Sequence, residues 1–154
     1  MANTPGVCYT FKTDVLKGVH AFQSATGGKG AADTFKGALY LTAASPAIAN
    51  TTTAFTTTGE VPASGTYALG GQIITTNTVA NTLGVAYWTP GASLSWTGFT
   101  GTNFDTLLIY NNTVAGNNAV AVYTFSNQII TAGTFTLTMP TNDAVTGLLR
   151  LSGT

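Results

Sequence analysis

Two side chains in this sequence are candidates for nucleophilic chemistry, because it holds one cysteine, Cys8, and one histidine, His20. A Cys/His pair would need both, and a Ser/His/Asp triad would need His20 as its base. No Gly-x-Ser-x-Gly motif presents a serine nucleophile. His20 stands beside Val19 and Phe22 in a segment with helical hydrophobic spacing. We therefore expect His20 to be structural, Cys8 to be a small packed residue, and the protein not to be an enzyme.

The acidic residues give little basis for a metal site or an acid/base pair, because they are far apart in the sequence. They are Asp14, Asp33, Glu60, Asp105 and Asp143. Zinc needs three or four clustered ligands, which this sequence never groups. Asn103 with Asp105, or Asn142 with Asp143, could hold Ca²⁺ only if the fold brought further oxygens close. A glycosidase pair of carboxylates could form between distant strands, but no two residues are singled out. We expect no metal and no cofactor.

The four lysines all lie within the first 36 residues: Lys12, Lys17, Lys29 and Lys36. They give this part of the chain a mild positive bias, which is most simply a solvated face. The functional alternative is a docking patch for an acidic protein surface. Gly27 to Gly30 contains Lys29 and resembles a phosphate loop in composition, but the Walker spacing is not met. This glycine-rich segment is predicted to be a flexible loop.

Four aromatic residues gather around Pro90 and Gly91: Tyr87, Trp88, Trp96 and Phe99. Tyrosine or tryptophan on a loop or a sheet face can stack on sugar rings, so carbohydrate binding is one interpretation. The simpler interpretation is that Trp88 and Trp96 fill the core from neighbouring strands, as a central tryptophan often does in a sandwich.

The composition indicates strands and a weakly charged surface. Of 154 residues, 44% are hydrophobic and only 6% are charged, while Thr (31), Gly (18) and Asn (11) supply most of the polarity. Threonine favours strands, and glycine and asparagine favour turns. The net charge is zero, which makes nucleic acid or an anionic membrane an improbable partner. No apolar run approaches a membrane span, and one cysteine excludes an internal disulfide. We expect a soluble protein with a tendency to assemble.

The hydrophobic spacing predicts one helix and then strands. An arm over residues 1–10 precedes an amphipathic helix over 12–22, with Thr13 as its N-cap. The predicted strands are 34–42, 54–61, 72–79, 84–89, 93–97, 106–111, 119–126, 134–140 and 147–151. The clearest lies at 134–139, where Phe, Leu and Met alternate with Thr. Residues 119–125 are apolar on both faces, which favours burial on two sides.

These elements predict an all-β fold. Short strands separated by turn signals favour an antiparallel β-sandwich, jelly-roll-like or immunoglobulin-like, with one short N-terminal helix. We expect a single domain over residues 1–154, in which the arm and helix occupy about residues 1–32.

Several phrases of the chain resemble a family of small virion structural proteins of tailed bacteriophages. They are FKTDVLKGVHAF (11–22), DTFKGALY (33–40), TAFTTTGEV (53–61), TYALGG (66–71), YWT and SLSWT (87–89 and 93–97), FDTLLIYN (104–111) and AGTFTLTMPTND (132–143). The resemblance covers most of the chain and implies a head decoration protein or another head or tail accessory component. It carries over no catalytic residue.

The resemblance and the composition together predict a non-enzymatic capsid decoration, or cement, protein. We expect it to be assembled in the host bacterial cytoplasm, to reside in the virion and to dock on the major capsid protein as a homo-oligomer, with a trimer as the simplest choice. The lysines and Tyr87, Trp88 and Trp96 are the candidate partner contacts. The alternatives are a glycan-binding tail fibre or spike component that uses these aromatic residues and a small hydrolase that depends on His20.

Overall fold

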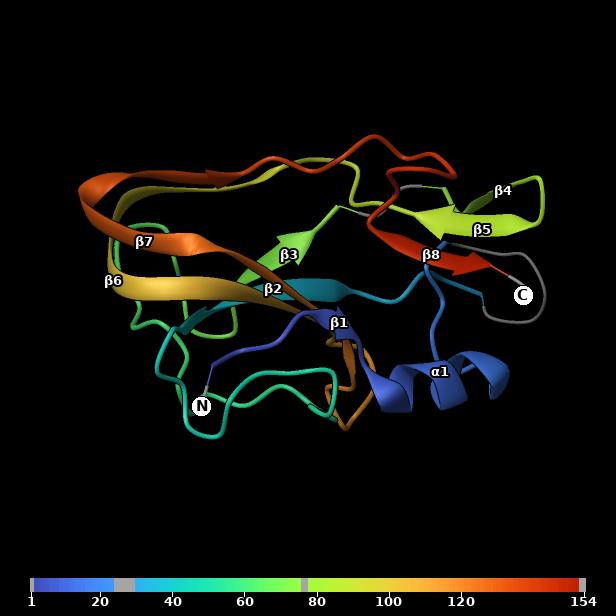
Figure 1. The fold of residues 1–154 in the computed structure, drawn as a ribbon, viewed down its shortest axis with the longest axis horizontal. Coiled ribbons are helices and arrows are strands. Elements are labelled where there is room, and N and C mark those ends of the chain that lie inside the picture. Colours follow the sequence, from blue (N-terminus) through green and yellow to red (C-terminus); the bar gives the residue numbers. More distant parts are fainter. Residues whose placement is uncertain (1, 24–29, 76–77, 153–154) are drawn as a thin grey trace.

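The computed structural model describes residues 2–23, 30–75 and 78–152, and the following sections concern this part of the chain. The elements in chain order are β1 (Gly6–Val7), α1 (Tyr9–Leu16), β2 (Phe35–Leu41), β3 (Gln72–Ile74), β4 (Ala80–Thr82), β5 (Val85–Trp88), β6 (Leu94–Asn111), β7 (Ala119–Leu137) and β8 (Leu149–Ser152). The strands form two antiparallel sheets, a five-stranded sheet in the order β1-β7-β6-β2-β3 and a three-stranded sheet in the order β4-β5-β8 (Figure 1). The predicted all-β class with one short N-terminal helix is confirmed.

A long hairpin of β6 and β7 dominates the fold. The two strands have 18 and 19 residues, and at the left of Figure 1 they fold over, so that the outer part of the hairpin lies above the inner part. The sequence predicted separate strands at 93–97 and 106–111, and again at 119–126 and 134–140. That division is wrong, because each pair belongs to one strand whose pairing continues through the bend.

Bulges and left-handed residues make the bend. Register shifts between β6 and β7 recur across residues 96–106. Such bulges twist a strand locally and turn it. Gly98 and Asn103 have φ angles of 59° and 51°, in the left-handed region. At Gly101 an added Cβ would lie 2.6 Å from the Phe99 ring, so only glycine lets that ring fold inward. The strand predictions stopped where these residues interrupt the alternation.

Aromatic rings fill the space inside the bend. The Phe135 ring, on the outer part of β7, stacks on Trp96 with centroids 5.9 Å apart and meets Phe104 edge-on at 4.9 Å. Phe99 packs edge-on against Phe104 at 5.4 Å. Trp96, Phe99 and Phe104 are all fully buried. Edge-to-face and stacked pairs of this kind stabilise a core beyond the area they bury.

The alternation predicted at 134–139 is present in the outer half of β7. Phe135 is buried while Thr134 and Thr136 are exposed, as a half-buried strand requires. In the inner half, residues 119–122 are at most 1% exposed, so this part is covered on both faces. The outer half therefore presents threonine hydroxyls to the surface, and the inner half belongs to the core.

Helix α1 covers Tyr9–Leu16 instead of the predicted 12–22. Cys8, and not Thr13, is the N-cap residue, and its side chain makes no capping hydrogen bond. The helix ends early because Gly18 adopts a left-handed φ of 67°, a conformation that commonly terminates helices. The second half of the predicted helix therefore lies beyond it.

The segment predicted as an arm is part of the fold. β1 pairs with β7 through Ala121 and Val122. The Asn3 side chain donates to the Leu41 carbonyl at 2.9 Å and accepts from the Ile48 amide at 2.8 Å. These bonds fix residues 3–7 against distant parts of the chain.

The predicted strand at 54–61 is wrong. This segment forms only isolated bridges, at Ala54 and at Glu60. Gly59 has a φ of 78°, and a Cβ there would lie 2.7 Å from the Ala44 Cβ, so the chain turns tightly at this glycine. The threonine-rich composition favoured a strand, but the tight turn at Gly59 interrupts the extended backbone that a strand needs.

The remaining predicted strands agree more closely. The ranges 34–42 and 84–89 contain β2 and β5, and 147–151 overlaps β8. The range 72–79 contains only the three residues of β3, and residues 76 and 77 within it lie outside the described part of the chain. Figure 1 places the three-stranded sheet and α1 at the opposite end of the molecule from the bend.

β4 was not predicted, because its pairing depends on a two-residue turn. Leu83 and Gly84 both have positive φ angles, 50° and 81°, which suits a two-residue hairpin. β5 then pairs with β8, with Trp88 opposite Leu149. In the residues described, no helix has the length and apolar character to cross a membrane.

Truncating a ring inside the bend tests the role of the aromatic cluster. Phe104→Ala removes a fully buried ring that packs against three others, those of Phe99, Phe125 and Phe135. We expect a loss of about 3–5 kcal/mol in the free energy of unfolding, since a cavity replaces the ring. Urea denaturation measures this, with exposed Thr134→Ala as a control expected to change stability by less than about 0.5 kcal/mol. Equal stabilities of the two variants would show that the cluster does not support the bend.

Candidate functional site

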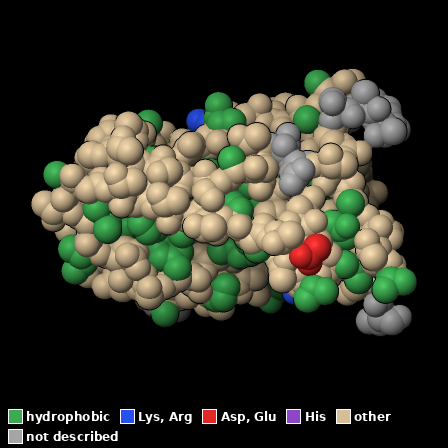
Figure 2. Space-filling model, turned by 90° about the horizontal axis from the view of Figure 1, so that it is seen from above, with side chains coloured by type: hydrophobic (Ala, Val, Ile, Leu, Met, Phe, Trp, Pro, Cys, Tyr) green, Lys and Arg blue, Asp and Glu red, His purple; other side chains and the backbone are tan. Residues whose placement is uncertain are grey.

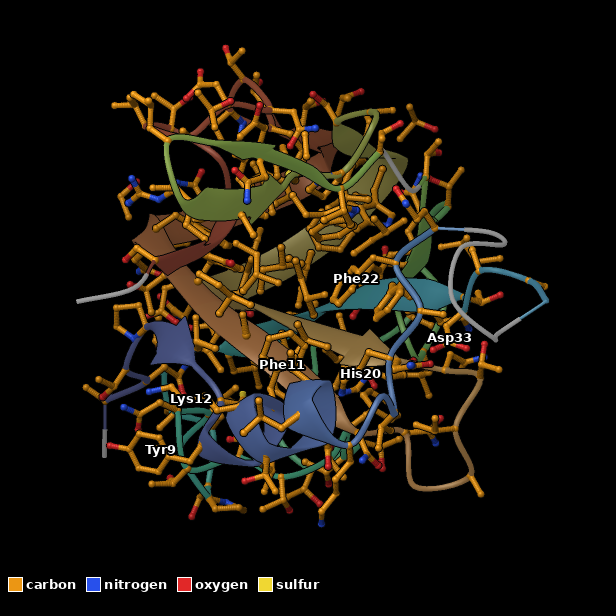
Figure 3. All side chains as sticks on the ribbon, turned by 90° about the vertical axis from the view of Figure 1, so that its right-hand side faces the viewer. Tyr9, Phe11, Lys12, His20, Phe22 and Asp33 are labelled. Carbon is orange, nitrogen blue, oxygen red and sulfur yellow. The ribbon has the colours of Figure 1, made fainter. Side chains whose placement is uncertain are left out.

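His20 lies in a network of polar side chains beyond the end of α1 (Figure 3). Its Nδ1 is 2.9 Å from the Asn111 amide nitrogen, and its Nε2 is 3.6 Å from a carboxylate oxygen of Asp14. The Asn111 amide also donates to Asp33 at 2.7 Å, and Asn118 donates to Asp14 at 2.8 Å. The network therefore joins α1, the segment after it and the hairpin end where β6 meets β7.

These contacts hold chain segments in place. The His20 side chain is only 1% exposed, and Asp33 accepts the Ala21 backbone amide at 2.8 Å. Cys8 is fully buried, and burial raises the pKa of its thiol to about 11, so the thiol stays protonated at neutral pH. The structure brings the Asp14 carboxylate to His20 and connects His20 to Asp33 through the Asn111 amide, an arrangement that the sequence did not predict.

The loop acids considered as calcium ligands already accept hydrogen bonds within the protein. Asp143 accepts from the backbone amide and the hydroxyl of Thr146, at 2.7 and 2.8 Å, and these bonds lower its pKa. Asp105 accepts from Asn3 at 3.0 Å and from Thr106 at 2.6 Å. Within the ranges 2–23, 30–75 and 78–152, no three His, Cys, Asp or Glu side chains gather as a metal-binding group.

The lysines occupy different surroundings. Lys12 and Lys17 are exposed at α1, where the Lys12 ammonium lies 5.6 Å from the centre of the Tyr9 ring. Lys36 is half-buried on β2. Lys29 lies outside the described residues, as do Gly27 and Gly28 of the predicted glycine-rich loop. Of the four lysines, only Lys12 and Lys17 are shown together at α1, so a docking patch there would consist of these two.

Neither tryptophan is on the surface. Trp96 is 1% exposed inside the hairpin bend, and Trp88 is 2% exposed at the end of β5. Tyr87 is half-buried, with its hydroxyl 3.3 Å from that of Thr82. Sugar rings stack on exposed aromatic faces, so the two indoles are not placed as stacking platforms.

A second polar cluster, centred on Glu60, was missed by the sequence analysis. Glu60 is 6% exposed, and its Oε1 accepts from the Tyr67 hydroxyl at 2.8 Å and the Gly70 amide at 2.7 Å. Burial raises the pKa of the Glu60 carboxyl. The two hydrogen bonds and the nearby Lys36 charge lower this pKa, but the effect of burial is larger. Both hydrogen-bond donors lie in the loop between Glu60 and β3, at separations of 7 and 10 residues that match no motif, so no sequence spacing marks the cluster.

Buried tyrosines surround Glu60. The Tyr40 hydroxyl donates to the Thr56 carbonyl, and the Tyr110 hydroxyl donates to the Gly70 carbonyl at 2.7 Å. Burial, and then the Glu60 charge, raise the pKa of Tyr110 to about 12. The cluster pins the chain between β2 and β3 onto the five-stranded sheet.

The longest open strand edge belongs to β7. Its neighbour β1 pairs only with Ala121 and Val122, so over residues 123–137 β6 is the sole strand partner in the described part of the chain. These 15 residues include no charged residue and no proline. Ile129 stands in the middle of this edge strand and is 62% exposed. Charges and prolines commonly protect edge strands from pairing with other chains, and both are missing here.

The face seen from above carries few charges. Figure 2 shows mostly backbone and uncharged polar side chains, with hydrophobic side chains between them. On the outer part of the hairpin, the Ser95 and Thr136 hydroxyls bond across the strands at 2.8 Å. This surface offers hydroxyls and apolar groups rather than ion pairs.

No family model matches the chain, and no curated protein or solved structure matches it either.

The pH dependence of stability tests the Glu60 cluster. Because the raised pKa makes the folded protein bind this proton more tightly than the unfolded chain, the free energy of unfolding decreases as pH rises above 4.5, the ordinary value. We expect Glu60→Gln to abolish this decrease, which denaturation from about pH 4 to about pH 8 measures.

The matched control is Asp143→Asn. Hydrogen bonds from Thr146 lower the pKa of Asp143, so this residue adds stability that is lost as pH falls through and below its ordinary value of 3.8, and Asp143→Asn should keep the decrease in stability toward pH 8. An identical slope in native protein and Glu60→Gln would show that Glu60 is not buried in its neutral form.

Proposed function

We propose that this chain is a non-enzymatic bacteriophage virion structural protein, a capsid decoration or cement protein. In this proposal it docks on the major capsid protein as a symmetric homo-oligomer, a trimer at sites of threefold symmetry. The open, uncharged edge of β7 over residues 123–137 carries the proposal. A monomeric protein that exposed such an edge would risk uncontrolled pairing, so a defined partner for the edge is the physical expectation.

The other strand edges are poor docking sites by comparison. On β6, residues 94–103 also lack a second strand partner in the described part of the chain, but this stretch is shorter than 123–137, and Thr66 bonds to Thr97 within it. β1, β3, β4 and β8 have only two to four residues each. Short edges offer few free backbone groups. A threefold ring uses head-to-tail contacts, so the β7 edge of each copy would meet a different surface of the next copy.

The distribution of ionisable groups supports a structural role. His20, Asp14 and Asp33 bond to one another or to asparagine amides, and Glu60 is held by Tyr67 and Gly70. These groups fix loops to the sheets. Few charges are left for the surface, so docking would depend on apolar burial and on backbone and hydroxyl hydrogen bonds.

The folded-over hairpin supports a β-sandwich in this proposal. Its outer part packs through Trp96 and Phe135 onto the inner part, which carries Phe104 and Phe125. Two β layers facing each other across such a core are the architecture of a sandwich. The alternative of a glycan-binding tail component has less support, because Trp88 and Trp96 are at most 2% exposed.

A charge placed on the β7 edge tests the assembly. We expect the native protein to have a mass three times the 15.7 kDa of the chain in size-exclusion chromatography with light scattering. Ile129→Lys puts an ammonium on the open edge and should shift the protein to a monomer. The matched control is Ile73→Lys, since Ile73 is 61% exposed on β3 and should leave the oligomer intact. A native monomer at every concentration would refute the proposal.

Salt separates apolar docking from ionic docking. Because the chain has only five basic and five acidic residues, we expect the oligomer and its attachment to capsids to persist from low to molar NaCl. Co-sedimentation with capsids measures attachment. Release at high salt would instead indicate that the lysines at α1 form the contact. Cryo-electron microscopy of intact virions locates the protein on the head or the tail.

A further inference from the structure

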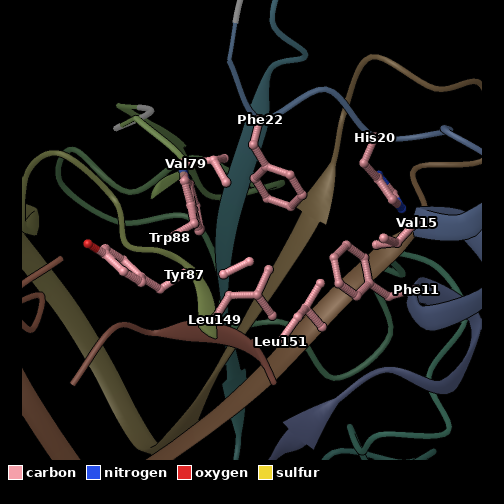
Figure 4. Close-up of a pocket in the computed structure, with 10 residues that line it drawn as sticks. Phe11, Val15, His20, Phe22, Val79, Tyr87, Trp88, Leu149 and Leu151 are labelled. Carbon is pink, nitrogen blue, oxygen red and sulfur yellow. The ribbon is translucent and has the colours of Figure 1, made fainter. Parts of the chain in front are cut away.

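A cavity of about 170 Å³ lies between α1 and the three-stranded sheet (Figure 4). Phe11 from the helix, Phe22 from the segment after it, and Trp88 and Leu149 from the sheet form its walls. Leu151 also lines the cavity and is 41% exposed, so it marks the opening to solvent. The elements that line the cavity, α1, β5 and β8, are at the end of the molecule opposite the hairpin bend (Figure 1), and Phe11 and Phe22 are seen from that end in Figure 3.

The cavity has stiff aromatic walls. The Phe22 ring stacks on Phe35 with centroids 4.4 Å apart and lies 4.9 Å from the Trp88 ring. Phe11 lies 5.9 Å from Phe22 and meets it edge-on. These rings support one another, so the walls resist collapse into the space. An apolar cavity of about 150 Å³ in another protein stays dry and binds benzene, so this space is large enough for one small ring.

Trp88, one of the lining residues, has a polar atom without a partner in the described part of the chain. The Trp88 indole is 2% exposed, and its Nε1–H makes no hydrogen bond to any of the residues described. A buried tryptophan N–H usually finds an acceptor, because leaving a buried donor unsatisfied is unfavourable. The combination of an apolar space and one unsatisfied donor is typical of a small-molecule site, where few polar groups fix the orientation of the ligand.

We propose that this cavity binds one small uncharged molecule, with a single aromatic or cyclic apolar body and one hydrogen-bond acceptor for Trp88 Nε1–H. The apolar walls favour the aromatic or cyclic part of the ligand, and its acceptor atom gives the Trp88 indole N–H a hydrogen-bond partner. This site is separate from the proposed docking edge, so either can fail without the other.

Acetophenone and ethylbenzene are a matched pair of probes, because they have similar size and only the first has a carbonyl acceptor. We expect acetophenone to bind about fivefold more tightly, the effect of one hydrogen bond. In ¹⁵N-labelled native protein, the Trp88 indole N–H resonance should shift with acetophenone. The Trp96 resonance, from the buried indole at the bend, should stay in place and serves as an internal control.

Two variants test the assignment by calorimetry. Trp88→Phe keeps an aromatic wall but lacks the N–H, so it should bind the two probes equally. Ala86→Phe, which adds a ring to the lining, should reduce binding of both at least tenfold, while exposed Val145→Leu should bind like the native protein. Circular dichroism confirms that each variant is folded.

The site is disproved if the Trp88 resonance does not move at saturating acetophenone, or if both indole resonances move together. It is also disproved if the native protein does not distinguish the two probes, or if Ala86→Phe binds them undiminished.

Discussion

The bend of the β6–β7 hairpin sets the shape of the rest of the molecule. A two-stranded ladder that folds back on itself encloses a space, and that space must be filled by apolar side chains. Trp96, Phe104 and Phe135 fill it, while bulges and left-handed residues absorb the turning of the backbone. The inner half of the hairpin then supplies the central strands onto which β1 and β2 are added. Without the bend, the aromatic face of each strand would lie in solvent.

The scarcity of charge is linked to the way the loops are held. Asp33 and Glu60 are both buried and accept hydrogen bonds: Asp33 from the Ala21 amide and from Asn111 of β6, and Glu60 from Tyr67 and Gly70 of its own loop. A buried acid of this kind holds a loop against the sheet, because breaking its hydrogen bonds would leave a polar group unsatisfied in the interior. The surface is left to hydroxyls, amides and apolar groups, which suit close contact with other protein surfaces.

The sequence was informative where one local rule decided the outcome. The alternation of Phe and Thr at 134–139 reports a half-buried strand directly, and the all-β class follows from many such segments. The sequence-based prediction was wrong where contacts between residues far apart in the chain determine the local backbone. Gly59 needs a turn against Ala44, and the bend at Gly101 depends on the Phe99 ring, so neither is visible in local spacing. Both caused strands to be placed wrongly.

The candidate sites were less predictable than the fold. The burial of Trp88 and Trp96 was anticipated, but the cavity beside Trp88 is built from three segments that only the fold brings together. Glu60 and its partners Tyr67 and Gly70 lie in one loop, and they meet only because that loop folds back on itself against the sheet. The open edge of β7 could not be foreseen, because it depends on which strand fails to pair beside it.

The anchoring of residues 3–7 has a consequence for the order of events during synthesis. Asn3 bonds to Asp105, and β1 pairs with Val122, so the first part of the chain must wait for more than 100 later residues before it can settle. β5 likewise waits for β8. Folds dominated by such remote pairings form slowly. A ribosome-bound nascent chain of this protein should therefore stay open until its last strands emerge, and would depend on chaperones for longer than a helical protein of equal length.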